Sequence, residues 1–287
     1  MNKPYSSFSL SSNDLTLSDL FKGDLQLSSP PAIYFQLKKV IDDPSKTMAD
    51  AGNVIDKDPG LTIRLLKLVN SAFFGFPSQI STISRAISII GTQELQNLVL
   101  GTLIIEKFSN VPAGSISLND YWAQSVRTAL AAKEISKRTQ SAEKLETIFI
   151  CGLLHEIGKL VLYRRIPELA REISLLIESS DETDSALERR LLGFDHYQVG
   201  SELSRLWKLP EVITESIAQH NAIYNTGPFS ETAAIVRLAA KLSKMELEDS
   251  IDKELDHFNI SQSLLVEIMN SVHDQFEEIF AIFYPKR

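Results

Sequence analysis

The chain has 287 residues, 44% of them apolar, and carries a formal net charge of -8 with an isoelectric point near 5.3. This apolar content excludes a disordered chain and predicts a substantial core, in one large domain or two joined lobes. The acidic balance argues against a nucleic-acid-binding surface, because phosphate binding depends on clustered Lys and Arg. We therefore expect no nucleic-acid partner.

Cysteine content and hydropathy indicate a soluble protein of a reducing compartment. The only cysteine, Cys151, cannot form an internal disulfide. The N-terminal residues contain no apolar run typical of a secretory signal. The most apolar stretch, residues 98–105, is far shorter than the ~20 residues of a membrane span. We expect a cytoplasmic protein without a membrane-spanning helix.

The first 27 residues are rich in serine and predict a loosely docked tail with one marginal amphipathic turn. That turn has four large apolar side chains: Leu15, Leu17, Leu20 and Phe21. The folded domain is expected to begin at Ser29-Pro30-Pro31, because two prolines block a helix behind them and favour one ahead.

An N-terminal helical lobe is predicted over residues 28–108, where apolar residues recur at helical spacing. Asp58-Pro59-Gly60 separates two of its helices. A short helix over 84–90 should end at Gly91, and Thr92 should cap the next one. The run from Phe73 to Phe76 could be core or an exposed partner-binding patch, and the sequence leaves both open.

A linker is predicted over residues 109–118, which contain proline, glycine, serine and asparagine. A second lobe follows over 119–245, and 246–287 is expected to be a C-terminal helical extension. Nothing alternates with a period of two, so the predicted fold class is all-α. The expected helices span about 119–139, 144–163, 166–178, 184–192, 195–207, 210–221, 229–245 and 261–281.

The most informative segment is His155-Glu156-Ile157-Gly158-Lys159. Histidine and carboxylate side chains can hold a divalent metal that activates water against a phosphate ester, provided that other helices bring further ligands. In a helix over 144–163, Cys151, His155 and Lys159 would share one face. The simpler interpretation is a buried histidine hydrogen-bonded to a backbone carbonyl, and spacing alone favours it.

Residues 151–160 resemble the GLLHDIGKL segment of the HD superfamily of metal-dependent phosphohydrolases. The chain as a whole resembles the HDOD family, helical bacterial signalling proteins related to the HD-GYP cyclic-di-GMP phosphodiesterases. The likeness extends over about residues 28–245 and implies a two-lobed helical bundle. The segments that carry it, besides 151–160, are Ile55 to Thr62, Leu65 to Gly75, Ile83 to Gly91, Asp195 to Gly200, Leu206 to Pro210, and Gln219-His220-Asn221.

The resemblance also implies a metal-ligand set, and this chain departs from it at four positions. Gln124 stands where the family pattern has the first histidine, and Glu156 stands where it has the aspartate of the His-Asp pair. Asn221 replaces the second histidine of a pair, and Ala240 replaces the final aspartate. Four weak candidate ligands remain: His155, Glu156, His196 and His220. We expect no cofactor, and leave open one divalent metal ion.

Lys159 is the candidate ligand-binding residue. In HD-GYP-like enzymes the equivalent lysine faces substrate phosphate, so the resemblance implies that a retained cleft could hold a phosphate-bearing ligand. The favoured alternative is a lysine that reaches solvent or pairs with Glu156 or a nearby carboxylate. Trp207 is expected to be a core anchor whose indole N–H needs a partner. His257 and His273 are given no role.

Three functions follow from these observations. The leading hypothesis is a non-catalytic regulatory protein that acts in signal transduction through protein–protein interaction. The resemblance implies partners such as a histidine kinase, a response regulator or a component of a cyclic-di-GMP pathway. The alternatives are a metal-dependent phosphohydrolase or phosphodiesterase with an atypical ligand set, and a sensor of a cyclic dinucleotide or other nucleotide.

Overall fold

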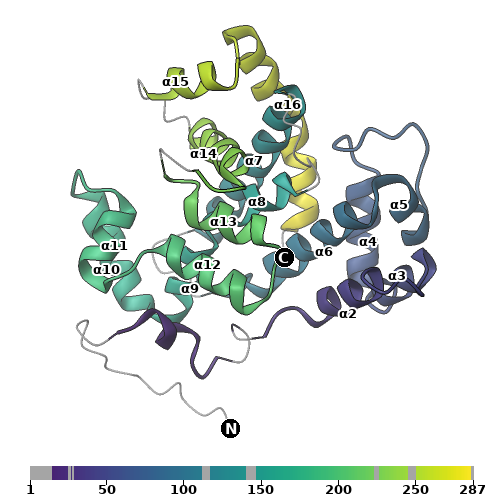
Figure 1. Cartoon of the computed structure of the whole chain (residues 1–287), viewed down its shortest axis with the longest axis horizontal. Helices are drawn as coiled ribbons and strands as arrows, with labels where there is room; N and C mark the ends of the chain where they lie inside the picture. The colour runs from purple at the N-terminus through teal and green to yellow at the C-terminus, as the bar shows by residue number, and fades with distance from the viewer. Residues whose placement is uncertain are drawn as a thin grey trace.

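A computed structural model describes residues 15–24, 27, 29–111, 117–139, 147–222, 226–244 and 250–285. These described residues form helices, turns and loops and contain no strand, which confirms the all-α prediction. Figure 1 shows two groups of helices, with the N-terminal helices α2 to α5 on one side and α9 to α13 on the other. Most of the predicted linker, residues 112–116, lies outside the described part of the chain.

The N-terminal lobe follows a short 3₁₀ helix and contains five α-helices whose starts are set by local capping. Thr47 and Asp50 form a capping box, and Asp58 accepts a hydrogen bond at the start of a helix that has proline in its first position. Gly91, at φ +86°, caps the last helix, so the prediction that Thr92 is the cap was wrong. The elements are η1 (Leu17–Phe21), α2 (Ala32–Ile41), α3 (Met48–Ile55), α4 (Pro59–Val69), α5 (Ile83–Ile90) and α6 (Thr92–Lys107).

The second lobe is built around α7, which packs against α8, α14 and α16. Its helices are α7 (Leu118–Arg138), α8 (Ile148–Leu154), α9 (Ile157–Arg165), α10 (Pro167–Glu178), α11 (Asp184–Leu192), α12 (His196–Leu206), α13 (Glu211–Gln219) and α14 (Ser230–Lys244). Two C-terminal helices follow, α15 (Ser250–His257) and α16 (Gln262–Phe283).

The prediction of a single helix over 144–163 was wrong, because a turn at His155-Glu156 interrupts the helix and separates α8 from α9. The Nδ1 atom of His155 hydrogen-bonds the carbonyl oxygen of Gly152 at 2.7 Å. In a continuous helix that oxygen would accept the N–H of Glu156. His155 and Lys159 therefore belong to different helical segments rather than to one face.

The described part of the N-terminal tail makes specific contacts with the second lobe. Leu20 and Phe21 are buried. Asp24 forms an ion pair with Arg164 of α9, with an N–O distance of 2.7 Å. The indole N–H of Trp207 donates to the carbonyl oxygen of residue 27 at 2.7 Å. The tail segment is thus held at both α9 and the end of α12.

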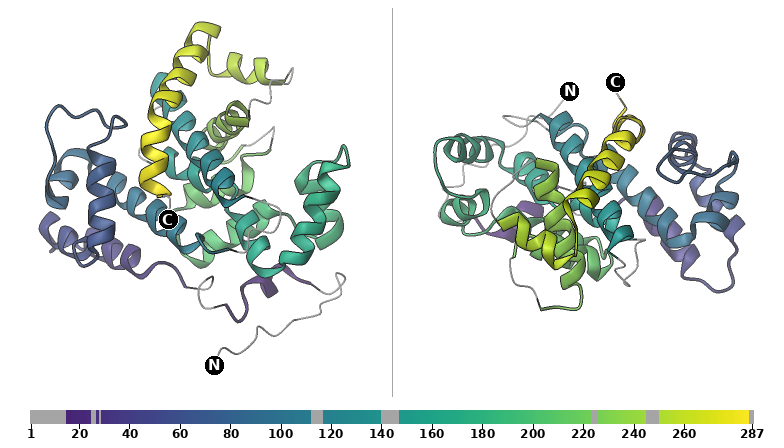
Figure 2. Two further views of the ribbon diagram at one scale, coloured as in Figure 1. Left: turned by 180° about the vertical axis from the view of Figure 1, so that it is seen from behind. Right: turned by 90° about the horizontal axis from the view of Figure 1, so that it is seen from above.

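The C-terminal helix α16 lies across both lobes, packing on α7 and also on α4 and α6 (Figure 2). Its Phe283 stacks on Phe149 of α8, with ring centroids 5.7 Å apart, and Phe149 contacts Phe73 at 5.1 Å. Phe73 is buried, and Phe74 and Phe76 are half-buried against the core. The question left open by the sequence is answered in favour of a core for Phe73.

Lys133 of α7 lies at this junction between the lobes. Its ammonium group is 3.3 Å from the ring centroid of Phe73 and 4.6 Å from that of Phe74. It also pairs with the buried Glu94 of α6 at 3.4 Å. Burial lowers the pKa of Lys133 to about 8, with the charge of Glu94 opposing that effect. Cation–π and ionic contacts therefore join the aromatic loop, α6 and α7.

Helices α9 and α12 cross at backbone contact, which places the His155-Glu156 turn against the start of α12. A Cβ atom on Gly158 would lie 1.8 Å from the carbonyl oxygen of His196 and 2.7 Å from the backbone nitrogen of Gly200. A Cβ on Gly200 would in turn lie 3.1 Å from the backbone nitrogen of Gly158. Glycine at both positions is what permits this approach.

We expect Gly158→Ala to destabilise the protein by about 3 kcal/mol or more, at the upper end of overpacking costs, because backbone atoms must separate. Gly60→Ala is the matched control, since its Cβ would meet only the side-chain Oδ1 of Asp58 at 3.3 Å. That control should change stability by no more than about 1 kcal/mol. Urea unfolding of both variants measures the difference, and equal midpoints would show that the crossing tolerates a methyl group.

Candidate functional site

His155 lies in the turn between α8 and α9 and is buried, with 1% of its surface exposed. Because its Nδ1 is engaged by the Gly152 carbonyl, the ring presents Nε2 as its remaining polar atom. That atom is buried and has no hydrogen-bond partner among the residues that the structure describes. A Cβ atom on Gly152 would lie 2.8 Å from the Cα atom of Ala129 of α7. The backbone before the turn therefore packs directly against the central helix of the lobe.

His196 is the first residue of α12 and is equally buried. Asp195 and Gln198 form a capping box that sets the helix start. One oxygen of Glu188, on α11, accepts from both the backbone nitrogen and Nδ1 of His196, at 2.7 and 2.6 Å. Glu188 thus orients the ring, and the Nε2 atom of His196 is buried without a hydrogen-bond partner in the described part of the chain. Sequence reasoning did not identify Glu188.

His220 follows α13 and completes a cluster of aromatic rings. Its Nδ1 atom contacts the carbonyl oxygen of Ser216 at 3.0 Å. Its ring lies edge-on to that of His155, with centroids 5.1 Å apart. Tyr197 contacts His220 at 4.8 Å and His196 at 3.9 Å. The structure therefore brings together the three histidines that the sequence singled out, with a tyrosine that it did not.

Glu156 does not face this cluster as an unpaired carboxylate, because two lysines hold it. The Nζ of Lys159 lies 3.0 Å from its Oε2, and the Nζ of Lys244 lies 3.5 Å from its Oε1. Lys159 also pairs with Asp184 of α11 at 2.8 Å. Lys244 comes from the last turn of α14, one turn beyond Ala240, and nothing in the sequence identified it.

The electrostatics follow from this arrangement. Burial alone would raise the pKa of Glu156, but the ammonium groups of Lys159 and Lys244 outweigh it and hold that pKa well below its usual range. Burial alone would lower the pKa of Lys159, but the carboxylates of Glu156 and Asp184 outweigh burial and raise that pKa above its usual range. The group is therefore a buried network of paired charges.

His155 and His220, which lie in the histidine cluster, are uncharged at neutral pH. Burial lowers the pKa of His155 to about 4. Burial, with a further contribution from His155, lowers the pKa of His220 to about 3. Their rings therefore act as neutral hydrogen-bonding groups over most of the pH range.

These residues do not fit the metal centre that the HD motif implies. Among the residues that the structure describes, no three His, Cys, Asp or Glu side chains are grouped so that they could hold one ion. The sole carboxylate of the candidate set, Glu156, has both oxygens beside lysine. The amide of Gln124 on α7 is a weak ligand for a transition metal, and Ala240 has no donor atom.

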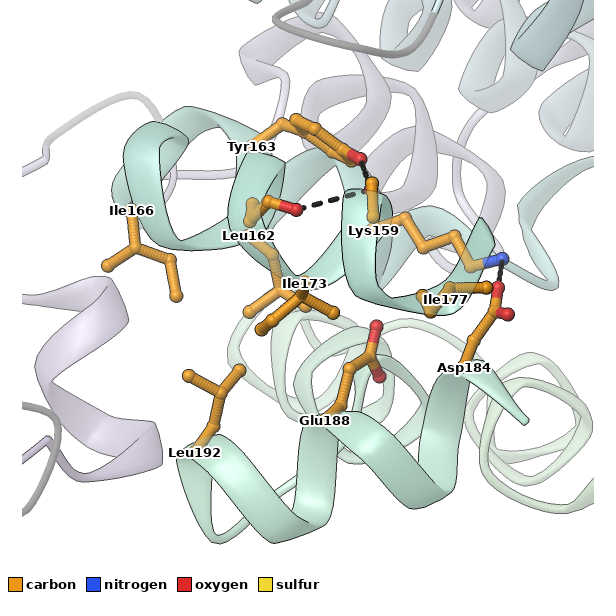
Figure 3. Close-up of a pocket in the computed structure, with 11 residues that line it drawn as sticks. Lys159, Leu162, Tyr163, Ile166, Ile173, Ile177, Asp184, Glu188 and Leu192 are labelled. Carbon is orange, nitrogen blue, oxygen red and sulfur yellow. Dashed lines mark hydrogen bonds and ion pairs between the residues drawn. The ribbon is translucent and has the colours of Figure 1, made fainter. Parts of the chain in front are cut away.

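Lys159 also borders a small cavity between α9, α10 and α11, shown in Figure 3, where its ammonium group points at Asp184. The cavity has a volume of about 50 Å³, which holds a few waters at most. Its walls are largely aliphatic, with Glu188 at one side. Lys159 is thus engaged by two carboxylates beside a space too small for a nucleotide.

Comparison with known proteins places the chain in a family. The model of the HDOD domain matches residues 27–223, more than half of the chain. The chain belongs to the HDOD domain family. This confirms the resemblance carried by the two groups of motifs, and the matched region includes the HD-like segment around His155.

A relative from Treponema pallidum (strain Nichols), an uncharacterized protein, is 27% identical over 245 residues, which is 82% of this chain. The chain spans 44% of that relative's length. A candidate phosphohydrolase from Shewanella amazonensis SB2B has a similar structure, with a TM-score of 0.73 and 23% identity, covering 91% of this chain and 99% of that one.

A candidate signal transduction protein from Marinobacter aquaeolei VT8 is also similar, with a TM-score of 0.69 and 21% identity. The match covers 89% of this chain and 58% of that one. At these identities the likeness establishes the two-lobed HDOD fold. Within the described residues, no helix is both long enough and apolar enough to span a bilayer.

The buried histidines generate a pH-dependence with a defined sign. Their folded-state pKa values lie below the ~6.5 of an unfolded histidine, so the unfolded state binds more protons once the pH falls below that value. Stability should therefore be lost as the pH falls from about 6.5 to about 4 for His155 and to about 3 for His220. Each histidine contributes a slope of up to about 1.4 kcal/mol per pH unit.

His220→Gln should remove about one such slope, whereas His257→Gln, at the exposed end of α15, should leave it unchanged. Urea unfolding at pH 5.0, 6.0 and 7.0 measures the slopes. An unchanged slope in His220→Gln would mean that His220 takes up its proton in the folded state as readily as in the unfolded state.

Proposed function

We propose that this HDOD protein is a non-catalytic regulatory protein that uses its HD-like scaffold to bind signalling proteins. The observation that carries the proposal is the pairing of Glu156 with two lysines, Lys159 and Lys244. A hydrolytic centre uses such a carboxylate to hold a metal ion that activates water. In this chain the positive charge beside Glu156 comes from side chains instead.

The lysine pair supports the proposal because it compensates the buried negative charge of Glu156 without a metal ion. A buried carboxylate is destabilising unless it is paired, and a divalent ion is one way to compensate it. Lys159 and Asp184 add a further opposite pair to the same network. Retention of the fold is therefore compatible with loss of the ligands at Gln124 and Ala240.

The partners that we propose are signalling proteins: a histidine kinase, a response regulator or a component of a cyclic-di-GMP pathway. The HDOD family assignment and the likeness to a candidate signal transduction protein support this direction. Capture of one of these partners by the purified protein, in the presence of a chelator, is the direct test. Capture that requires added metal would instead point to a metal-dependent role.

A second candidate function has one specific observation in its favour. The Nε2 atoms of His155 and His196 are both buried, and neither has a hydrogen-bond partner within the described residues. Buried polar atoms are rarely left unpaired, and an imidazole Nε2 is a common metal ligand. A phosphohydrolase with one metal ion bound by an atypical set is therefore the alternative, and it predicts activity that depends on His155.

For the non-catalytic protein we expect metal well below one ion per chain, and a melting temperature that EDTA leaves unchanged. Turnover of cyclic dinucleotides with Mg, Mn or Fe should not exceed background. Elemental analysis, thermal denaturation and phosphodiesterase assays on wild type and His155→Ala measure these properties. Stoichiometric metal and turnover, both lost in His155→Ala, would overturn the proposal and establish the second candidate.

A double-mutant cycle tests the charge pairing itself. In EDTA, Lys244→Met and Glu156→Gln should show a coupling energy of roughly 0.5–3 kcal/mol, as expected for contacting groups. The control is Lys241→Met with Glu156→Gln, because Lys241 lies on the same helix but pairs with Glu254 at 2.9 Å. We expect that coupling to be within about 0.5 kcal/mol of zero. Equal couplings would remove the special role assigned to Lys244.

A further inference from the structure

A groove of about 520 Å³ opens between η1, α11, α12 and the end of α13. These elements lie together on the side of the molecule away from α2 to α5 (Figure 1). The volume is in the range that holds a small organic ligand. The lining side chains come from all four elements and are mainly polar: Leu17, Arg189, Asp195, Tyr197, Gln198, Ser201, Glu202, Arg205, Ala218, Asn221 and Ala222.

Two arginines give the groove its chemical character. Arg189 of α11 is 57% exposed and uses its Nε to contact Asp195 at 2.6 Å. Arg205 of α12 is 55% exposed, and its Nη1 reaches Glu202 and Ser201 only at 3.5 Å. The remaining guanidinium nitrogens of both arginines make no hydrogen bond to any described residue. Several N–H donors therefore stay available at one groove.

Two acidic side chains, Asp195 and Glu202, also line the groove, and they differ in how strongly they pair with the arginines. Asp195 is almost fully buried, and its oxygens accept from Arg189 and from the backbone nitrogen of Gln198. Glu202 is half-buried and lies at the long distance of 3.5 Å from Arg205. An entering anion would therefore compete with one carboxylate, Glu202, and with the hydroxyl of Ser201 for the guanidinium of Arg205.

Neutral polar groups line the rest of the groove. Asn221 and Tyr197 can donate or accept hydrogen bonds there, and Ser201, whose hydroxyl donates to the carbonyl oxygen of Gln198, can accept them. The ring of Tyr197 also contacts His196 and His220, so the groove borders the histidine cluster. The Lys159–Glu156–Lys244 network contributes no residue to this lining.

We propose that this groove binds a small phosphate-bearing molecule, with phosphate oxygens held by Arg189 near the start of α12 and by Arg205 in its last turn. Guanidinium groups match the geometry of phosphate oxygens and form charge-assisted hydrogen bonds that are stronger than neutral ones. The remaining volume and the polar residues beside Tyr197 accommodate the rest of the ligand. The inference does not depend on whether the histidine cluster is catalytic.

Isothermal titration with inorganic pyrophosphate at constant ionic strength tests the phosphate subsite. We expect saturable binding at one site per chain, weakened roughly tenfold or more in Arg205→Gln, because a charge-assisted contact is removed. Glu202→Gln should tighten binding, because it removes the competing carboxylate. The opposite directions of these two effects distinguish a built site from general attraction.

Arg190→Gln is the matched control: Arg190 is also 57% exposed on α11, but it pairs with Glu182 and does not line the groove. It should bind pyrophosphate as wild type does. Arg189→Gln should weaken binding too, with circular dichroism checking α12, since Arg189 also contacts the residue that caps that helix. Absence of saturable binding by the wild type, or equal losses in Arg190→Gln and Arg205→Gln, would overturn the proposal.

A failure of this test is distinguishable from a failure of the regulatory proposal. The titration is performed in EDTA, where a phosphohydrolase centre that needs metal is silent. Metal content and turnover are measured on the same preparations. Pyrophosphate binding that depends on His155 but not on Arg205 would move the site to the histidine cluster and overturn the assignment to the groove.

Discussion

Backbone-to-backbone contact between α9 and α12 is the constraint on which the site depends. Gly158 lets the start of α9 press against the carbonyl of His196, and Gly200 meets it from the other helix. This approach draws the His155-Glu156 turn, at one end of α9, towards the capped start of α12. The crossing thereby brings the turn that carries His155 to the helix start that carries His196.

The polar centre of the second lobe divides into two electrostatically different halves. On one side, three imidazoles are bound through Nδ1 to carbonyl or carboxylate oxygens and pack around Tyr197. On the other side, Glu156 lies in a network of full charges with Lys159, Lys244 and Asp184. An HD hydrolase needs histidine and carboxylate side chains to bind the same metal ion. Here the carboxylate of Glu156 forms ion pairs with two lysines instead.

The fold was largely predictable from the sequence, whereas the site was predictable only in part. Helical periodicity and the spacing of the two motif groups are local signals, so the all-α class and the family could be inferred. The break at His155 could not, because it depends on a side chain taking a backbone acceptor within an apolar helical pattern. Lys244, Glu188 and Tyr197 were missed for another reason. Each reaches the site through tertiary packing, and the chain around them has no distinctive spacing.

The aromatic contacts of α16 have a mechanical consequence for how this protein could respond to a partner. Phe283 stacks on Phe149, in the short helix that ends beside His155, and Phe149 also contacts Phe73 of the N-terminal lobe. The C-terminal helix therefore touches α8 and, through Phe149, the N-terminal lobe by one stacked and one edge-on ring contact. A change in the angle between the two lobes would therefore have to rearrange these ring contacts together with the packing of α16 on α4, α6 and α7.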